Sequence, residues 1–159
     1  MACTVSIERA TASDIGACLP LLSDLHKGDT GQTMSDCLAD FCTGPNAVAL
    51  IARRGGETVG LLVGTEAPDL DFESHVATVN AIVVAAEYRG IGIGRALLNA
   101  FVDWAQQRQC AAVLYSTARD DAKRFAWAVG FVPRSPASTF IKHLVPPDQL
   151  GRSRRSEKE

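Results

Sequence analysis

Three glycines alternate with isoleucines directly after an arginine, in the segment R-G-I-G-I-G-R over residues 89–95. The residues that follow favour a helix. Glycine permits positive φ and close approach of the backbone, and the first amides of a helix have no partner within it. Several N–H groups and the positive end of a helix dipole would therefore meet at one place, where a phosphate or pyrophosphate is stabilised. Arg89 and Arg95 add full positive charges beside it.

Two common phosphate-binding loops do not fit this segment. A P-loop ends in Gly-Lys-Ser or Gly-Lys-Thr, whereas Gly94 is followed by Arg95 and Ala96. The dinucleotide fingerprint is G-x-G-x-x-G, whereas Gly90, Gly92 and Gly94 are spaced G-x-G-x-G, and the strand before them stands late in the chain. The spacing excludes both loops.

The hydrophobic pattern predicts the elements that hold this loop. We expect strands over 4–10, 47–54, 58–65, 75–85 and 111–117, with two closing strands over 131–134 and 138–145. Helices are expected over 15–26, 34–41, 95–107 and 120–129, and a polar acidic loop over 66–74. This order is neither a repeated βαβ series nor a meander, so it predicts an α/β fold of the mixed (α+β) kind, with one mixed sheet and helices on both faces.

Composition and charge narrow the function classes. The chain has 159 residues, 47% hydrophobic and 21% charged, as expected of one globular domain over 1–150, with a mobile charged tail over 151–159. With a net charge of −2, the chain lacks the positive field that binds nucleic acid, so we expect no nucleic-acid partner. No apolar run has signal-peptide or membrane length, so we expect a cytoplasmic protein without a membrane partner. The five cysteines have no metal-site spacing, and we expect no metal.

With the strand before it, the segment NAIVVAAEYRGIGIGRALL resembles the acetyl-CoA-binding motif of the GNAT superfamily, the Gcn5-related N-acetyltransferases. In that motif an arginine or glutamine precedes G-x-G-x-G or G-x-G-x-A. ERATASD, TVGLLVG and DDAKRFAWAVGF resemble the family's opening strand, third strand and fourth helix, so the resemblance covers about Val5 to Leu144. It implies the GNAT fold, with a mostly antiparallel central sheet, and acetyl-CoA as co-substrate.

The resemblance also implies which residues bind the coenzyme. In the family the strand before the loop splays from the strand after the helix, and the pantetheine arm lies in the gap. The main chain of Ile82, Val83 and Val84 would contact pantetheine and the thioester carbonyl. The pyrophosphate would be held by Arg89, Gly90, Ile91, Gly92, Ile93, Gly94 and Arg95. Arg119 replaces an asparagine often found early in the fourth helix, so a contact there would be charged.

Acetyl transfer to an amine requires a neutral amine, a stabilised oxyanion and a leaving thiolate. For the base, family members often use a carboxylate, or a water held by one, near the start of the central strand. Glu73 and His75 are the candidates there, although a charge at such a position is more often only a solvated loop residue. Together with Asp69 and Asp71 they form an acidic group that favours a cationic acceptor.

The expected acid for the leaving sulfur is missing. The family's fourth helix commonly carries a tyrosine that protonates the thiolate, and the aligned residue here is Ala126. Ser116, or Thr117 beside it at the end of a strand, is a candidate donor through a water, although a strand-end hydroxyl is more often structural. An alkyl thiol with a pKa of about 8.5 is a tolerable leaving group without full protonation.

The acceptor residues are the least determined. The resemblance places them around His26, Met34, Phe41, Phe72 and His143, where core packing is an equal alternative. We expect an N-acetyltransferase that acts on a small cationic amine by direct transfer in a ternary complex. The alternatives are a non-catalytic acyl-CoA-binding or regulatory module, which Ala126 favours, and a protein lysine or N-terminal acetyltransferase. A homodimer is common in the family, and the closing strands would supply its interface.

Overall fold

The computed structural model describes residues 4–25, 32–134, 140–144, 146 and 149. The chain divides into two compact units, Met1–Ser116 and Thr117–Glu159, and the whole sheet belongs to the first. No helix within the described ranges is long and apolar enough to cross a membrane.

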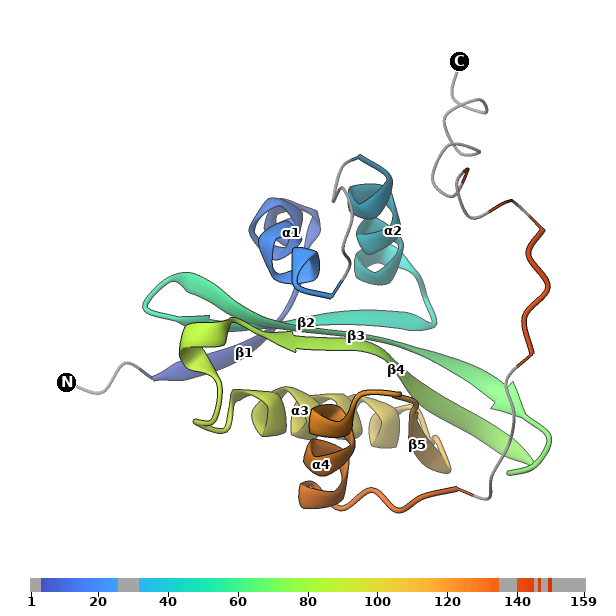
Figure 1. The fold of residues 1–159 in the computed structure, drawn as a ribbon. Helices are drawn as coiled ribbons and strands as arrows, with labels where there is room; N and C mark the ends of the chain where they lie inside the picture. The colour runs from blue at the N-terminus through green and yellow to red at the C-terminus, as the bar shows by residue number, and fades with distance from the viewer. Residues whose placement is uncertain (1–3, 26–31, 135–139, 145, 147–148, 150–159) are drawn as a thin grey trace. The chain divides into compact units, whose positions relative to one another are not determined.

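The first unit is built on a five-stranded sheet in the order β1-β2-β3-β4-β5 (Figure 1). The strands are β1 (Val5–Arg9), β2 (Ala47–Arg54), β3 (Glu57–Asp69), β4 (Ser74–Val84) and β5 (Ala112–Tyr115). The first four are antiparallel in sequence order, and β5 runs parallel to β4 because helix α3 crosses over between them. The mixed, mostly antiparallel sheet predicted from the sequence is confirmed.

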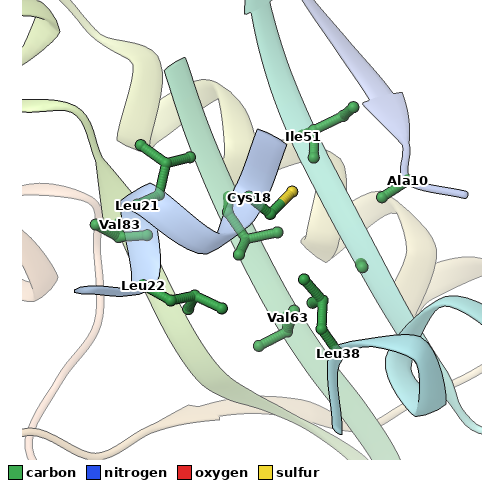
Figure 2. Close-up of a cluster of buried hydrophobic side chains, with 10 residues drawn as sticks. Ala10, Cys18, Leu21, Leu22, Leu38, Ile51, Val63 and Val83 are labelled. Atoms are coloured by element: carbon green, nitrogen blue, oxygen red, sulfur yellow. The ribbon is translucent and has the colours of Figure 1, made fainter. Parts of the chain in front are cut away.

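Helices cover both faces of this sheet (Figure 1). Helices α1 (Ile15–Ser23) and α2 (Gln32–Thr43) lie on one face, α3 (Ile93–Gln107) lies on the other, and two short 3-10 turns, η1 (Ala12–Asp14) and η2 (Ala86–Tyr88), precede α1 and α3. The core on the α1/α2 face contains Cys18, Leu21, Leu22 and Leu38 from the helices, packed on Ile51, Val63 and Val83 of the sheet (Figure 2). The buried residues of α3, Ile93, Leu97, Leu98, Phe101 and Ala105, recur at the spacing of one helical face.

The acidic loop predicted over 66–74 is wrong. Residues 66–69 continue β3 and pair with the first residues of β4, which leaves a turn of only Leu70 to Glu73. Pro68 is tolerated because β2 stops opposite Thr65, so the proline has no ladder partner on that side. The hairpin of β3 and β4 extends beyond the core. Its polar residues there lie on exposed strand faces, and in the sequence such residues are hard to distinguish from those of a loop.

The second unit contains α4 (Asp120–Ala128), which ends at Gly130 with a φ of +95°. The helix agrees with the prediction, but the two closing strands do not. Residues 131–134 and 140–144 are not strands, because Pro133 lacks a ladder donor and no partner strand occurs in the described part of the chain. Their apolar side chains, Val132, Phe140, Ile141 and Leu144, are exposed. Residues 135–139, 145 and the predicted tail lie outside the described residues.

Candidate functional site

The glycine loop, residues 89–94, leads directly into α3. Gly90 and Gly92 have φ values of +79° and +93°, a left-handed conformation that favours glycine. A β-carbon on either residue would meet nothing within 4 Å, so the space in front of the loop is open. Among the described residues, no group accepts a hydrogen bond from the amides of residues 90–94. These amides and the dipole of the 15-residue α3 form a site for an anion.

Buried Ile93 fixes the beginning of α3 against the sheet, with 3% of its surface exposed. Its neighbour Ile91 is 57% exposed, and Arg95 is exposed on the first turn of the helix. The loop therefore has one apolar anchor, while the rest of its residues face solvent.

Arg89 holds the loop to the end of β4. Its Nε donates to the carbonyl of Val84 at 2.9 Å, and its terminal nitrogen lies 3.9 Å from a carboxylate oxygen of Asp24, just after α1. The guanidinium is half-exposed, so it carries its charge to the loop while part of its bonding capacity holds the backbone. The role of phosphate ligand stays a prediction.

Tyr88 ties the loop to the β2–β3 turn. Its hydroxyl donates to Glu57 Oε2 at 3.0 Å, and the guanidinium carbon of Arg54 lies 5.4 Å from the centre of the ring. The pKa of the Tyr88 phenol is raised, mainly by the hydrogen bond to the Glu57 carboxylate and next by the negative charge of that carboxylate. This contact has no local signal in the sequence, because it joins residues 31 positions apart.

β4 and β5 stop pairing at Val79 and Tyr115, a point that we call the fork. Beyond the fork, Ile82, Val83 and Val84 pair with β3 alone among the strands of the described residues, so one edge of β4 has no strand partner there, and on that edge the Val84 carbonyl accepts from Arg89. The side chain of Val83 is buried in the core on the α1/α2 face, and its main chain pairs with Leu61 of β3. The strands stop pairing just before Ile82, Val83 and Val84, and pantetheine binding by these residues stays a prediction.

Two polar residues stand at the fork. Ser116 follows Tyr115 directly and is exposed, as its predicted role requires. Asn80 follows Val79 and is also exposed, and its side chain accepts a hydrogen bond from Thr65 at 3.1 Å. Asn80 is not among the predicted site residues, although an amide in the middle of the apolar run VATVNAIVVA was a signal for it.

The two candidate bases lie at the other end of β4. Glu73 is an exposed residue of the β3–β4 turn with a φ of 50°, and His75 is exposed and pairs with Pro68. His75 stands four residues before Val79 and nine before Val84, which is roughly 13 Å from the fork and roughly 30 Å from Val84 along a strand. The structure does not bring these two side chains to the fork.

Near His75, an ion pair closes the far end of α3. Arg108 donates to Glu66 Oε1 at 2.9 Å and to the carbonyl of Pro45 and the Asn46 side chain, and it lies over the ring of Trp104. The hydrogen bond from Arg108 is the main cause that lowers the pKa of Glu66. This cluster fixes the elements around β3 and stands away from the glycine loop.

The remaining predicted site residues are dispersed. Met34 and Phe41 pack against the α1/α2 core, and Phe72 lies in the β3–β4 turn with 36% exposed. In the second unit, Arg119 forms an ion pair with Asp121 at 2.7 Å, and His143 is exposed. Ala126 lies in α4, followed by Trp127 with 60% exposed. His26 lies outside the described residues.

Comparison with known proteins agrees with this geometry. Residues 17–131 match the model of the acetyltransferase (GNAT) family. Comparison of the sequence with curated proteins finds no significant match.

Solved structures share the fold at low sequence identity. A ribosomal-protein-alanine N-acetyltransferase from Brucella melitensis biovar Abortus 2308 is 22% identical, with a TM-score of 0.73, covering 88% of this chain and 99% of the other. The aminoglycoside 6'-N-acetyltransferase AAC(6')-Ih from Acinetobacter baumannii is 22% identical, with a TM-score of 0.79, covering 89% and 100%. AAC(6')-Iy in complex with a bisubstrate analogue containing CoA is 16% identical, with a TM-score of 0.79, covering 88% and 99%.

Proposed function

The chain belongs to the GNAT acetyltransferase family, and from this premise we propose that it transfers an acetyl group from acetyl-CoA to an amine of a small cationic molecule. The observation that carries the proposal is the glycine loop. Gly90 and Gly92 adopt left-handed conformations there, and the amides of residues 90–94, just before and at the beginning of α3, have no acceptor among the described residues. The fork stands at the other end of the path that a pantetheine arm would follow along β4. A cytoplasmic location and a possible homodimer are parts of the same proposal.

The transfer is direct, within a ternary complex. The amine attacks the thioester carbon, a C–N bond forms, and the C–S bond breaks as the electron pair leaves on sulfur. A main-chain N–H of β4 beyond the fork would stabilise the oxyanion, a contribution of about 3–4 kcal/mol in other enzymes. The proton that the amine loses goes to water. The thiolate departs without the usual tyrosine, since Ala126 stands at its place, and is protonated by solvent or by a water near Ser116.

The choice of acceptor is supported by the fold neighbours. Two of them act on or bind aminoglycoside-type amines by their descriptions, and one of these was solved with a bisubstrate analogue, which joins both substrates in one site. The net charge of −2 also favours a cationic acceptor. The ribosomal-protein-alanine N-acetyltransferase neighbour supports a second candidate, acetylation of a protein N-terminus.

Calorimetry with CoA and thiol release from acetyl-CoA test the proposal together. We expect CoA binding, and thiol release with small polyamines or aminoglycosides. Thiol release only with peptides would favour the second candidate. CoA binding without thiol release by any acceptor would identify the non-catalytic module, and no CoA binding would overturn the proposal as a whole.

Two glycine variants connect binding to the loop. Gly92→Ala places a β-carbon in the open space before the loop at a φ of +93°, and Gly56→Ala does the same in the β2–β3 turn at +83°. Each substitution costs about 1–2 kcal/mol of backbone strain. We expect Gly92→Ala to raise the Kd of CoA at least tenfold and Gly56→Ala to change it less than twofold. Equal effects would show that the loop does not bind the pyrophosphate.

A further inference from the structure

One residue of β4 is additional to the sheet. Gly64 pairs with Val79, but the next residue of β3, Val63, pairs with Ala81, so Asn80 has no partner across the ladder. This is a β-bulge, a feature that re-aims side chains and is frequent next to active sites.

The faces of the sheet on which the neighbouring side chains lie are independent evidence that Asn80 is an extra residue. On β3, Val63 belongs to the α1/α2 core, whereas a β-carbon on Gly64 would collide with Phe101 of α3. Their partners on β4 follow them, so Ala81 faces α1 and α2 while Val79 faces α3. Two odd-numbered residues therefore face opposite sides, and removal of Asn80 would restore a regular alternation. The sheet gains no packing from Asn80.

The bulge aims the Asn80 amide to the α1/α2 face of the sheet. Thr65 lies between Gly64 and Glu66, both of which face α3, so its own side chain faces α1 and α2. Its hydroxyl donates to Asn80 Oδ1 at 3.1 Å and fixes the orientation of the amide. Asn80 is exposed, and no other partner of its amide is found in the described part of the chain. One lone pair on Oδ1 and both N–H groups are available to a ligand.

We propose that Asn80, oriented by Thr65, binds the acceptor next to its reacting amine and selects the acceptor. The inference rests on the proposed function. Asn80 directly follows the last residue of β4 that pairs with β5, so its side chain stands where the thioester would end. Its Oδ1 accepts a hydrogen bond from the acceptor N–H and directs the nitrogen lone pair to the thioester carbon. An amide does not titrate, so Asn80 orients the amine and takes no proton from it.

Three variants test this role by steady-state kinetics with a panel of amines. Asn80→Ala removes the contact and should raise the acceptor KM about tenfold, with the acetyl-CoA KM within twofold. Thr65→Val keeps the volume, loses the donor and should raise the acceptor KM about threefold. Asn80→Asp places a carboxylate at the same position, so it should favour the most basic amines and add an inflection to the acidic limb of the pH profile of kcat/KM. Asn99→Ala, on an exposed residue of α3, is the control and should match the unchanged chain.

The outcomes separate this inference from the function on which it rests. CoA affinity by calorimetry reports whether each variant is folded. The role of Asn80 alone would be overturned if the wild-type chain transfers acetyl groups and the Asn80 variants show the same acceptor KM and the same amine preference as the wild-type chain. An equal rise in the KM of both substrates would also overturn it, because a structural role would act on both. No transfer by the unchanged chain with any amine would overturn the proposed function and this inference together.

Discussion

Gly60 of β3 lies directly against Ile93, the first residue of α3. A β-carbon on Gly60 would stand 3.2 Å from Cγ2 of Ile93 and 3.1 Å from Cδ1 of Leu97, and Ala52 would touch it from the neighbouring strand at 3.3 Å. Because Gly92 immediately precedes Ile93, the distance between α3 and the sheet sets the position of the glycine loop. The missing side chain at Gly60 therefore helps to set the position of the proposed coenzyme loop.

Gly60→Ala should move the beginning of α3 outward. We expect overpacking to lower the free energy of unfolding by about 1 kcal/mol and the Kd of CoA to rise about fivefold. Gly16→Ala is the matched control, because its β-carbon meets nothing within 4 Å and alanine is the better helix former in α1. It should stabilise the chain by about 0.5–1 kcal/mol with unchanged CoA affinity. Denaturant unfolding and calorimetry measure both quantities, and a destabilised Gly60→Ala with unchanged Kd would contradict the link.

The Tyr88 hydroxyl should affect coenzyme binding more than turnover. Tyr88→Phe keeps the ring beneath Arg54 and removes only the hydrogen bond to Glu57. We expect the KM for acetyl-CoA to rise about threefold, with kcat within twofold, because a loop held less firmly binds the coenzyme less well. Glu57→Gln keeps an acceptor for the hydroxyl and should preserve most of the affinity. A fall in kcat alone would assign Tyr88 to another role.

The Arg108–Glu66 ion pair should make the stability of the chain depend on pH. Arg108 lowers the pKa of Glu66 in the folded state below the ordinary value of 4.5, so the carboxylate stabilises the fold above that pH. This stability is lost as the pH falls from 4.5 through the lowered pKa. Glu66→Gln should cost about 1–2 kcal/mol at pH 7, after a discount for the partial exposure of Arg108. Urea unfolding at pH 7 and near pH 3 should show the difference shrinking in acid, and a constant difference would argue against the ion pair.

The cysteines should react in the order of their exposure. Cys37 is exposed, whereas Cys18 is 1% exposed in the α1/α2 core and burial raises the pKa of its thiol to about 11. A thiol reagent at pH 8 should therefore modify Cys37 in the native chain and Cys18 only on unfolding. Peptide mapping after timed labelling measures the order. Modification of both at one rate in the native chain would show that Cys18 is not buried in the α1/α2 core.

Local signals predicted the elements and the glycine loop. The β-branched runs, the helical spacing of α3 and the glycines at residues 90 and 92 each encode local structure, and each appears where the sequence placed it. The sequence placed the end of β3 too early, because residues 66–69 form strand only through their partner, β4. Residues 131–134 show the converse, since this run was predicted as a strand from its local pattern and pairs with no strand in the described part of the chain.

The sequence predicted the conformation of the glycine loop but not the exposed amide of Asn80 at the bulge. Binding through main-chain amides leaves a trace in the sequence, because only glycine adopts positive φ easily. A bulge leaves no such trace, since its position depends on the register between β3 and β4. Glu73 and His75 were suggested because they are close in sequence to the central strand. In the structure they stand at the beginning of β4, at the other end from Val84.

Because Asn80 is an extra residue in β4, the sheet could accommodate its loss without a change in the pairing on either side of it. Two enzymes that differ by this single residue would keep the same core on both sides of β4, because the side chains before and after it retain their facing. A deletion here would act like a substitution in a surface loop, although it falls inside the central strand. Acceptor choice could then change between relatives by the gain or loss of one codon, with the coenzyme loop left intact.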